Sequence, residues 1–367
     1  MDEKRHTVKL LAIGLTSACL FGAATPASKA LLAEIQPQVL AGLLYLGAAF
    51  GVLPVVIRTK SFRLPWHAGR RTFLLLAGAI FLGGILGPLL LLLGLTAASS
   101  GSVALWLNLE FVATAVLGHF VFREHLTARG WAAAGGTLLA ALLLAGGEGG
   151  AGFLWVSLVA FACLCWGFDN HFTALIDGIT PAQITLWKGL VAGTFNLIVG
   201  GAIGDGIGQL HVVLMALLVG AISYGVSVTL YIITSQGFGA SRSQMVFSTA
   251  PFFGVLLSVA VLGETLTGTQ ALSAGIMGVS LVLLFTEKHI HVHRHDAISH
   301  QHAHRHMDGH HDHEHSGLPA TASHSHWHVH DPVEHAHKHW PDLHHRHDHD
   351  DDEKSELPNK PDARDGS

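Results

Sequence analysis

The feature that most limits how this chain can fold is a series of apolar segments, each about twenty residues long, separated by short polar breaks. A helix of that length is just long enough to cross the hydrocarbon core of a bilayer. We predict ten such segments, at 9–29, 37–57, 72–94, 99–121, 129–146, 153–175, 182–203, 210–234, 240–262 and 268–286. They are too uniformly apolar for the alternating strands of an outer-membrane barrel. The sequence therefore predicts an all-α membrane protein with ten transmembrane helices.

The composition changes abruptly after Thr286. The first 286 residues hold 13 Lys and Arg against 10 Asp and Glu, whereas the last 81 hold 8 against 16 and contain 23 of the 29 His. A single soluble globular domain would have about a quarter of its residues charged. The chain therefore divides into an apolar membrane part and a polar tail.

Basic residues in the connections predict the orientation of the membrane part. The N-terminal stretch and the second and fourth connections contain Lys or Arg, and Arg242 stands next to the eighth connection. The first, third, fifth, seventh and ninth connections contain none, and the sixth carries no bias either way. Connections rich in Lys and Arg remain on the cytoplasmic side of a membrane. We therefore expect a multi-pass protein of the cell (inner) membrane with both termini in the cytoplasm.

Two short motifs recur along the chain. Glu-x-Leu-Thr at 124–127 returns at 264–267, and an aromatic-Gly pair at 21–22 returns at 166–167. Both motifs return after a similar length of chain, which indicates two halves of five segments each. An odd number of segments gives the halves opposite orientations in the membrane, which is an architecture typical of secondary transporters.

These halves, with an aromatic-Gly pair in the first segment and Glu-x-Leu-Thr closing the fourth segment of each, resemble the drug/metabolite transporter superfamily in its EamA-domain branch. The resemblance covers residues 8–286. It implies two inverted five-helix repeats, 8–146 and 152–286, and export of a small metabolite. The first half departs from the family pattern at Glu110-Phe111, where the second half has Ala250-Pro251.

Ionisable side chains inside apolar segments are the candidates for the transport pathway. A charge at membrane depth costs about 2.5–3.5 kcal/mol on insertion scales, so it needs a partner or a wet cavity. The candidates, with two polar neighbours, are Lys29, Glu110, Asp169, Lys188, Asn108 and His171. Asp169 and His171 suit a proton relay or cation binding. A structural alternative is that Asp169 pairs with Lys29 or Lys188, and that Lys29 extends outward from its segment end.

The tail after Thr286 is a low-complexity His- and Asp-rich segment for which we expect no regular structure, that is, a disordered cytoplasmic tail at 287–367. Its alternating histidines are suited to Zn, Ni, Co or Cu ions. Binding should weaken as pH falls through the ordinary imidazole pKa of about 6.5. The candidate metal ligands are His289, His291, His293, His295, His300, His302, His304, His306, His310, His311, His313, His315, His324, His326, His328 and His330.

No phosphate-binding loop, nucleophile elbow or zinc-protease motif occurs in the membrane part, so we expect neither an enzyme nor a required cofactor. The leading hypothesis is a secondary exporter of a small metabolite or drug-like solute, with a metal-binding tail. The alternatives are an exporter of divalent transition metal ions, and a membrane-anchored metal sensor or store. Expected partners are the bilayer and the transported solute or metal ion, with a homodimer left open and no nucleic acid.

Overall fold

The computed structural model describes the backbone of residues 2–59, 62–122, 128–147, 149, 152–203, 206, 208–285, 290–295, 298–304, 324–330 and 333–338. It describes their side chains except at 2–7, 238, 241, 242, 284, 285 and in the tail. The helices are α1 (Asp2–Gly22), α2 (Ala24–Leu31), α3 (Pro37–Thr59), η1 (Pro65–His67), α4 (Arg70–Ala79), η2 (Ile80–Leu86), α5 (Gly87–Ala97), α6 (Ser100–Trp106), α7 (Leu109–Phe120), α8 (Ala128–Gly147), α9 (Gly152–Ala174), α10 (Pro181–Ile203), α11 (Leu210–Val219), η3 (Gly220–Val226), α12 (Ser227–Phe238), α13 (Ala240–Phe247), α14 (Ala250–Leu262) and α15 (Gly268–Phe285).

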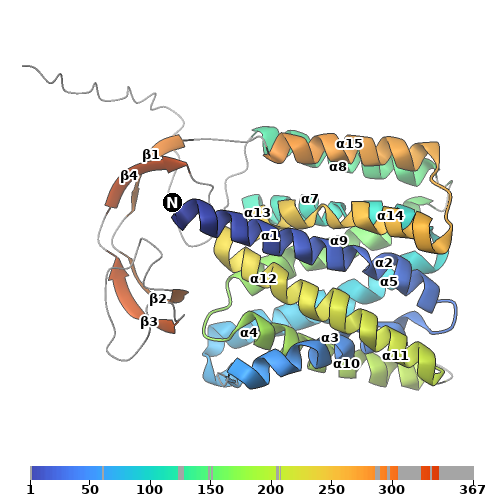
Figure 1. The fold of residues 1–367 in the computed structure, drawn as a ribbon, viewed down its shortest axis with the longest axis horizontal. Coiled ribbons are helices and arrows are strands. Elements are labelled where there is room, and N and C mark those ends of the chain that lie inside the picture. The colour runs from blue at the N-terminus through green and yellow to red at the C-terminus, as the bar shows by residue number, and fades with distance from the viewer. Residues whose placement is uncertain are drawn as a thin grey trace, which may run out of the picture.

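The membrane part is a bundle of helices, as the apolar segments predicted. Within the described residues, nine helical segments are long and apolar enough to cross a membrane. They span 8–31, 37–59, 70–97, 100–120, 128–147, 152–174, 181–203, 210–237 and 243–262. The tenth predicted segment is α15, whose apolar stretch is shorter and which packs beside α8 (Figure 1). The predicted all-α membrane fold is confirmed. The beginning of α1, the beginning of α4 and the end of α15 lie at the same end of the bundle (Figure 1).

The two halves repeat each other in structural detail. The π-helical segment η2 (Ile80–Leu86) is matched in the second half by η3 (Gly220–Val226), and the two are separated by the same length of chain as the two Glu-x-Leu-Thr motifs. The fourth segment of each half is broken into two helices, and α6 and α13 begin at equivalent positions of the repeat. Gly22 lies against α14, where an added Cβ would be 2.7 Å from the carbonyl oxygen of Ala250, and Gly167 lies against the corresponding helix α7. Because each half has five spans, corresponding helices run in opposite directions, as in an inverted repeat.

Pro88, at the start of α5, follows the irregular segment η2 and has no N–H to donate to the preceding turn. Side chains donate to two carbonyl groups of η2: Tyr45 Oη and Trp166 Nε1 donate to Gly83 O at 2.5 and 3.0 Å, and Asn196 Nδ2 donates to Gly84 O at 3.2 Å. The π-helical segment η2 is thereby held by three other helices.

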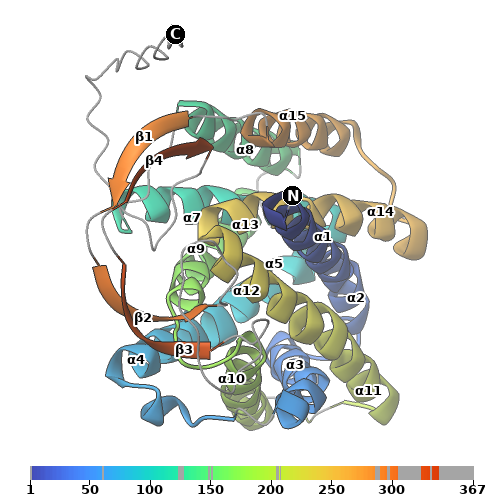
Figure 2. The ribbon, with the colours of Figure 1, turned by 60° about the vertical axis from the view of Figure 1, so that its left-hand side comes forward.

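The most extensive helix packing in the bundle is that of α3 against α10, which lie side by side at the bottom of the view in Figure 2. Small residues allow this close approach, because lipid provides no hydrophobic drive between helices and packing must supply it. A Cβ at Gly189 would be 2.6 Å from Tyr45 O, and one at Gly193 would be 2.7 Å from Leu46 N. These two glycines therefore allow α10 to approach α3 closely.

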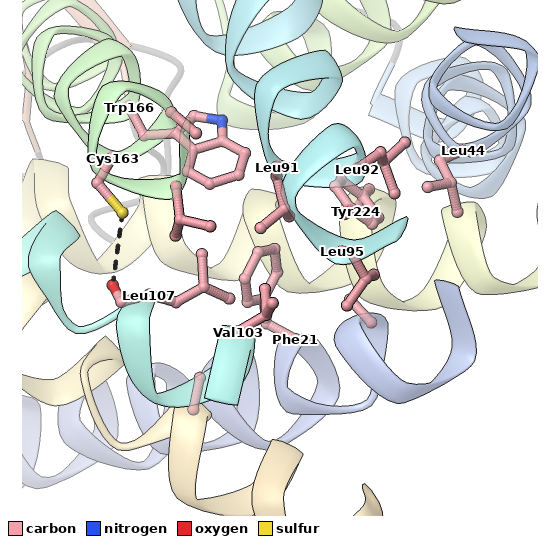
Figure 3. Close-up of a cluster of buried hydrophobic side chains, with 14 of the residues drawn as sticks. Phe21, Leu44, Leu91, Leu92, Leu95, Val103, Leu107, Cys163, Trp166 and Tyr224 are labelled. Atoms are coloured by element: carbon pink, nitrogen blue, oxygen red, sulfur yellow. Dashed lines mark hydrogen bonds between the residues drawn. The ribbon is translucent and has the colours of Figure 1, made fainter. Parts of the chain in front are cut away.

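A large cluster of buried apolar side chains fills the interior of the bundle (Figure 3). It includes Phe21, Leu92, Trp166 and Tyr224, which come from four different transmembrane segments. The thiol of Cys163 lies within it, 3.9 Å from the carbonyl oxygen of Leu107 at the break between α6 and α7. The cluster fixes the helices that carry the candidate site.

The described part of the tail differs from the expectation of no regular structure. It contains four strands, β1 (Ile290–His295), β2 (Ile298–His304), β3 (His324–His330) and β4 (Val333–Lys338). They form two antiparallel pairs, β1 with β4 and β2 with β3. Alternation of His with residues such as Val, Ile and Trp is a period-two pattern, which fits a β-ladder. The strands lie at the end of the bundle where α1 begins (Figure 1).

Candidate functional site

A narrow central cavity lies between the two halves of the bundle, in two adjoining parts that share some of their lining residues. Both parts are lined by Phe21, Glu110 and Phe247. The larger part is also lined by Tyr45, Trp166, Asp169, Asn170, Thr173, Lys188, Tyr224, Val228, Tyr231 and Ile232. The smaller part extends along Gly22, Thr25, Ala104, Leu107, Gln244, Ser248, Ala250, Pro251 and Gly254. A cavity at the junction of two repeats is where secondary transporters bind their substrates.

Asp169 and Lys188 form a buried ion pair in the wall of this cavity. Lys188 Nζ on α10 donates to Asp169 Oδ2 on α9 at 2.5 Å, and both residues are 5 % exposed or less. The other carboxylate oxygen, Asp169 Oδ1, is buried without a hydrogen bond from any described residue. Gly83 makes room for this carboxylate, because a Cβ there would collide with Asp169. Of the two partners predicted for Asp169, the structure selects Lys188.

Glu110 lies on the same cavity but belongs to a different network. Its Oε1 accepts a hydrogen bond of 2.9 Å from Asn170 Nδ2, which also lies 3.1 Å from Thr114 Oγ1 and 3.2 Å from Gln244 Oε1. This group joins α7, α9 and α13 through buried amides and a hydroxyl. Among the described side chains, no Lys or Arg forms an ion pair with Glu110.

Aromatic rings make up much of the remaining wall. Five rings follow one another along the wall and form what we call the aromatic arc, in the order Tyr45, Tyr224, Phe21, Phe247 and Tyr231. Successive ring centroids are 5.6, 5.6, 4.9 and 5.0 Å apart. Such distances are typical of edge-to-face or tilted aromatic pairs, which hold rings in place. The cavity therefore combines ionisable groups with a rigid apolar surface.

Three of the predicted site residues lie outside the cavity lining. Lys29 Nζ donates to the carbonyl oxygens of Leu95 at 2.8 Å and Ala98 at 2.9 Å, so it caps the C-terminal end of α5. Asn108 sits at the break between α6 and α7, with Nδ2 3.4 Å from Leu105 O. His171 is fully buried, with Nδ1 2.8 Å from the carbonyl oxygen of Gly167.

The Glu-x-Leu-Thr motif of the second half acts as a helix cap. Glu264 Oε1 accepts from the backbone N–H of Ser100 at 3.0 Å and from its hydroxyl at 2.7 Å, while Oε2 accepts from the N–H of Gly101 at 3.0 Å. These groups belong to the first turn of α6, whose N–H groups have no partner within the helix. The equivalent motif of the first half, 124–127, lies outside the described residues.

Neither the aromatic arc nor Gln244 was among the site residues predicted from the sequence. Aromatic side chains are common in membrane helices, so a single one carries no signal. The recurring aromatic-Gly pairs did carry one, because Phe21 and Trp166 from those pairs both line the cavity. The departure from the repeat at Glu110 was a second such signal, because Glu110 and its counterpart Ala250 both line the smaller part of the cavity.

No group of three or more His, Cys, Asp or Glu side chains that could hold a metal ion occurs among the residues the structure describes. Several candidate ligands of the tail lie outside those residues, namely His289, His306, His310, His311, His313 and His315. In the tail strands only the backbone is described. Its register pairs His291 with His337 and His293 with His335 in one ladder. In the other it pairs His300 with His328, His302 with His326 and His304 with His324.

A bundle of membrane-crossing helices with a polar and aromatic cavity between two repeats defines a membrane transporter rather than an enzyme. The chain belongs to the EamA-like transporter family, whose model matches residues 8–146 and 153–286. A relative from Methanothermobacter thermautotrophicus (strain Delta H), described as an uncharacterized transporter, is 24 % identical over 291 residues. That match covers 74 % of this chain and 84 % of the relative. A solved crystal structure of 14 % identity covers 75 % of this chain and 95 % of its own with a TM-score of 0.58, which supports the fold.

Proposed function

We propose that this transporter is a secondary exporter of a small organic solute, which binds in the central cavity between the two halves. The observation that carries the proposal is the buried set of ionisable groups, Glu110, Asp169 and Lys188, around one cavity of a membrane bundle. Ionisable residues within a membrane are costly and mark solute or proton pathways. The aromatic arc adds an apolar surface suited to an organic molecule.

We further propose that the protein lies in the inner membrane with both termini on the cytoplasmic side. We also propose that the tail binds divalent transition metals. The basic connections support the orientation. The tail proposal rests on 23 histidines after Thr286 and on the register that sets His opposite His in both ladders. Neutral imidazole is a good ligand for Zn, Ni, Co and Cu(II). In this arrangement the tail gathers or senses metal beside a transporter for a different solute.

The test is a growth assay in a sensitive host, challenged with a panel of toxic organic solutes and with Ni, Co, Zn and Cu salts. It compares the full chain, a form lacking 287–367, the Asp169→Asn variant and a Glu34→Gln control. Glu34 is an exposed carboxylate outside the cavity, 3.6 Å from His211. Expression in the membrane is measured for each form.

We expect the full chain and the tail-deleted form to protect against at least one organic solute, with protection lost on Asp169→Asn and kept in the control. Protection against metals alone, abolished by Asp169→Asn, would favour the metal exporter instead. Metal-dependent effects that disappear with the tail, without protection by the membrane part, would favour a sensor or store.

A further inference from the structure

The charges in the wall of the central cavity do not balance. Its lining contains two carboxylates, Glu110 and Asp169, and one ammonium group, that of Lys188. Lys188 is committed to Asp169 at 2.5 Å. Lys29, the other cation predicted at membrane depth, is bound to carbonyl groups at the end of α5. Glu110 is thus the carboxylate of the cavity that forms no ion pair among the described residues, and Lys188, the cation that acts on it, is already paired with Asp169.

The partners of Glu110 are all neutral. Asn170 donates to it, and Thr114 and Gln244 complete the hydrogen-bonded group. The charged or titratable side chains that share the cavity or its wall are Asp169, Lys188, Tyr45, Tyr224, Tyr231 and Cys163. A carboxylate in this setting attracts a positive charge, because a membrane interior offers it little other stabilisation.

The ring system next to Glu110 has the composition of a cation-binding surface. Phe21 and Phe247 line both parts of the cavity together with Glu110, and Tyr231, Tyr224 and Tyr45 extend the arc on either side. An organic cation within about 6 Å of an aromatic ring is attracted by the ring quadrupole, and the effect grows when water is excluded. The same rings pack against the apolar part of such a molecule.

We infer that the central cavity recognises a monovalent organic cation, with the ammonium group against Glu110 and the aromatic arc around it. The inference rests on the proposed function and names its substrate class. An anionic solute would place a second negative charge beside Glu110, and a neutral solute would leave Glu110 either protonated or without a cationic partner. Glu110 is in this view the residue that selects for charge.

The test uses full-length protein in proteoliposomes and radiolabelled benzyltrimethylammonium as the probe in a counterflow assay. The two unlabelled competitors are choline and 3,3-dimethyl-1-butanol. They differ only in that the neutral alcohol has a carbon atom where choline has its cationic nitrogen. We expect counterflow of the probe, and choline should compete at least tenfold more strongly than the neutral alcohol. Equal competition by the two would overturn the inference, and this comparison needs no altered protein.

Variants of Glu110 test whether this residue is responsible for the preference for a cation. Glu110→Gln should weaken probe binding at least tenfold and remove the preference for choline, while Glu110→Asp should restore part of both. Glu34→Gln is the matched control and should behave as the unaltered chain. An unchanged preference in Glu110→Gln protein that elutes as a single species in gel filtration would also overturn the inference.

The two proposals can fail separately. If labelled neutral or zwitterionic solutes exchange in the same vesicles while the probe does not, the cation inference is wrong and the proposed exporter stands. If no solute of any charge class exchanges, the proposed function itself fails.

Discussion

Breaking the ion pair between Lys188 and Asp169 should destabilise the bundle strongly, whereas removing both charges should not. Lys188→Met keeps an unbranched side chain that is one atom shorter, but it leaves both oxygens of Asp169 without a hydrogen bond from the described residues. Asp169→Asn leaves the ammonium group buried beside a neutral amide. Leaving one charge of a buried pair alone costs about 3–5 kcal/mol.

The size of the effect follows from how little water reaches the pair. The side chains of Lys188 and Asp169 are 5 % and 8 % exposed, and their atoms are 2.5 Å apart. Insertion scales give a similar cost for a lone charge at membrane depth, about 2.5–3.5 kcal/mol, which is slightly below the cost of breaking a buried pair. The double variant Asp169→Asn/Lys188→Met buries no charge at this position, so we expect it to lie within about 2 kcal/mol of the unaltered protein.

The free energies are measured by SDS titration in mixed micelles, with unfolding followed by circular dichroism. Single-variant losses below about 1 kcal/mol, or a double variant that loses the sum of both, would show that the pair is not a desolvated unit. Solute exchange measured on the same proteins separates folding from function. We expect the double variant to fold but to exchange no solute, because both groups line the cavity.

Three further predictions concern the tail, a helix cap and a helix crossing. In equilibrium dialysis the full chain should bind Ni²⁺ at pH 7.5 and bind it at least tenfold more weakly at pH 5.5, because protons compete for imidazoles with an ordinary pKa of about 6.5. Equal binding by a form lacking 287–367 would contradict this. Glu264→Ala removes the carboxylate that caps α6, so SDS titration should show a loss of about 1–2 kcal/mol, with a smaller loss for Glu264→Gln. Gly193→Ala should destabilise by about 1–3 kcal/mol because the new methyl group meets Leu46 on α3. Gly201→Ala, in open space on the same helix, is the control, and a loss as large there would refute the packing argument.

Much of the fold was predictable because it depends on local properties of the chain. The length of an apolar segment is sufficient to predict a membrane span, and the nine spans and α15 lie within a few residues of the predicted segments. The repeat was visible because the two Glu-x-Leu-Thr motifs are separated by the same length of chain as η2 and η3. In the tail, histidines alternate with other residues at a period of two, which is typical of a strand. The prediction of no regular structure there gave more weight to the low complexity of the segment.

The candidate site was predictable only in its ionisable members. Glu110, Asp169 and Lys188 were detectable because a charge contradicts an apolar segment, and all three line one cavity. His171, Asn108 and Lys29 gave the same signal in the sequence, yet they bind backbone groups elsewhere in the bundle. Polarity at membrane depth shows that a side chain needs a partner without showing which partner it has.

The sequence by itself determined that this chain crosses a membrane in two related halves and ends in a histidine-rich tail, because hydrophobic length, repeat spacing and composition are properties of the chain alone. Only the tertiary structure decided that Asp169 pairs with Lys188 rather than Lys29, and that Glu110 shares its cavity with aromatic rings and forms no ion pair among the described residues. The physical reason is that helix rotation and approach depend on contacts between distant segments. Gly189 and Gly193 against α3 set one such contact, and it brings Lys188 to the cavity.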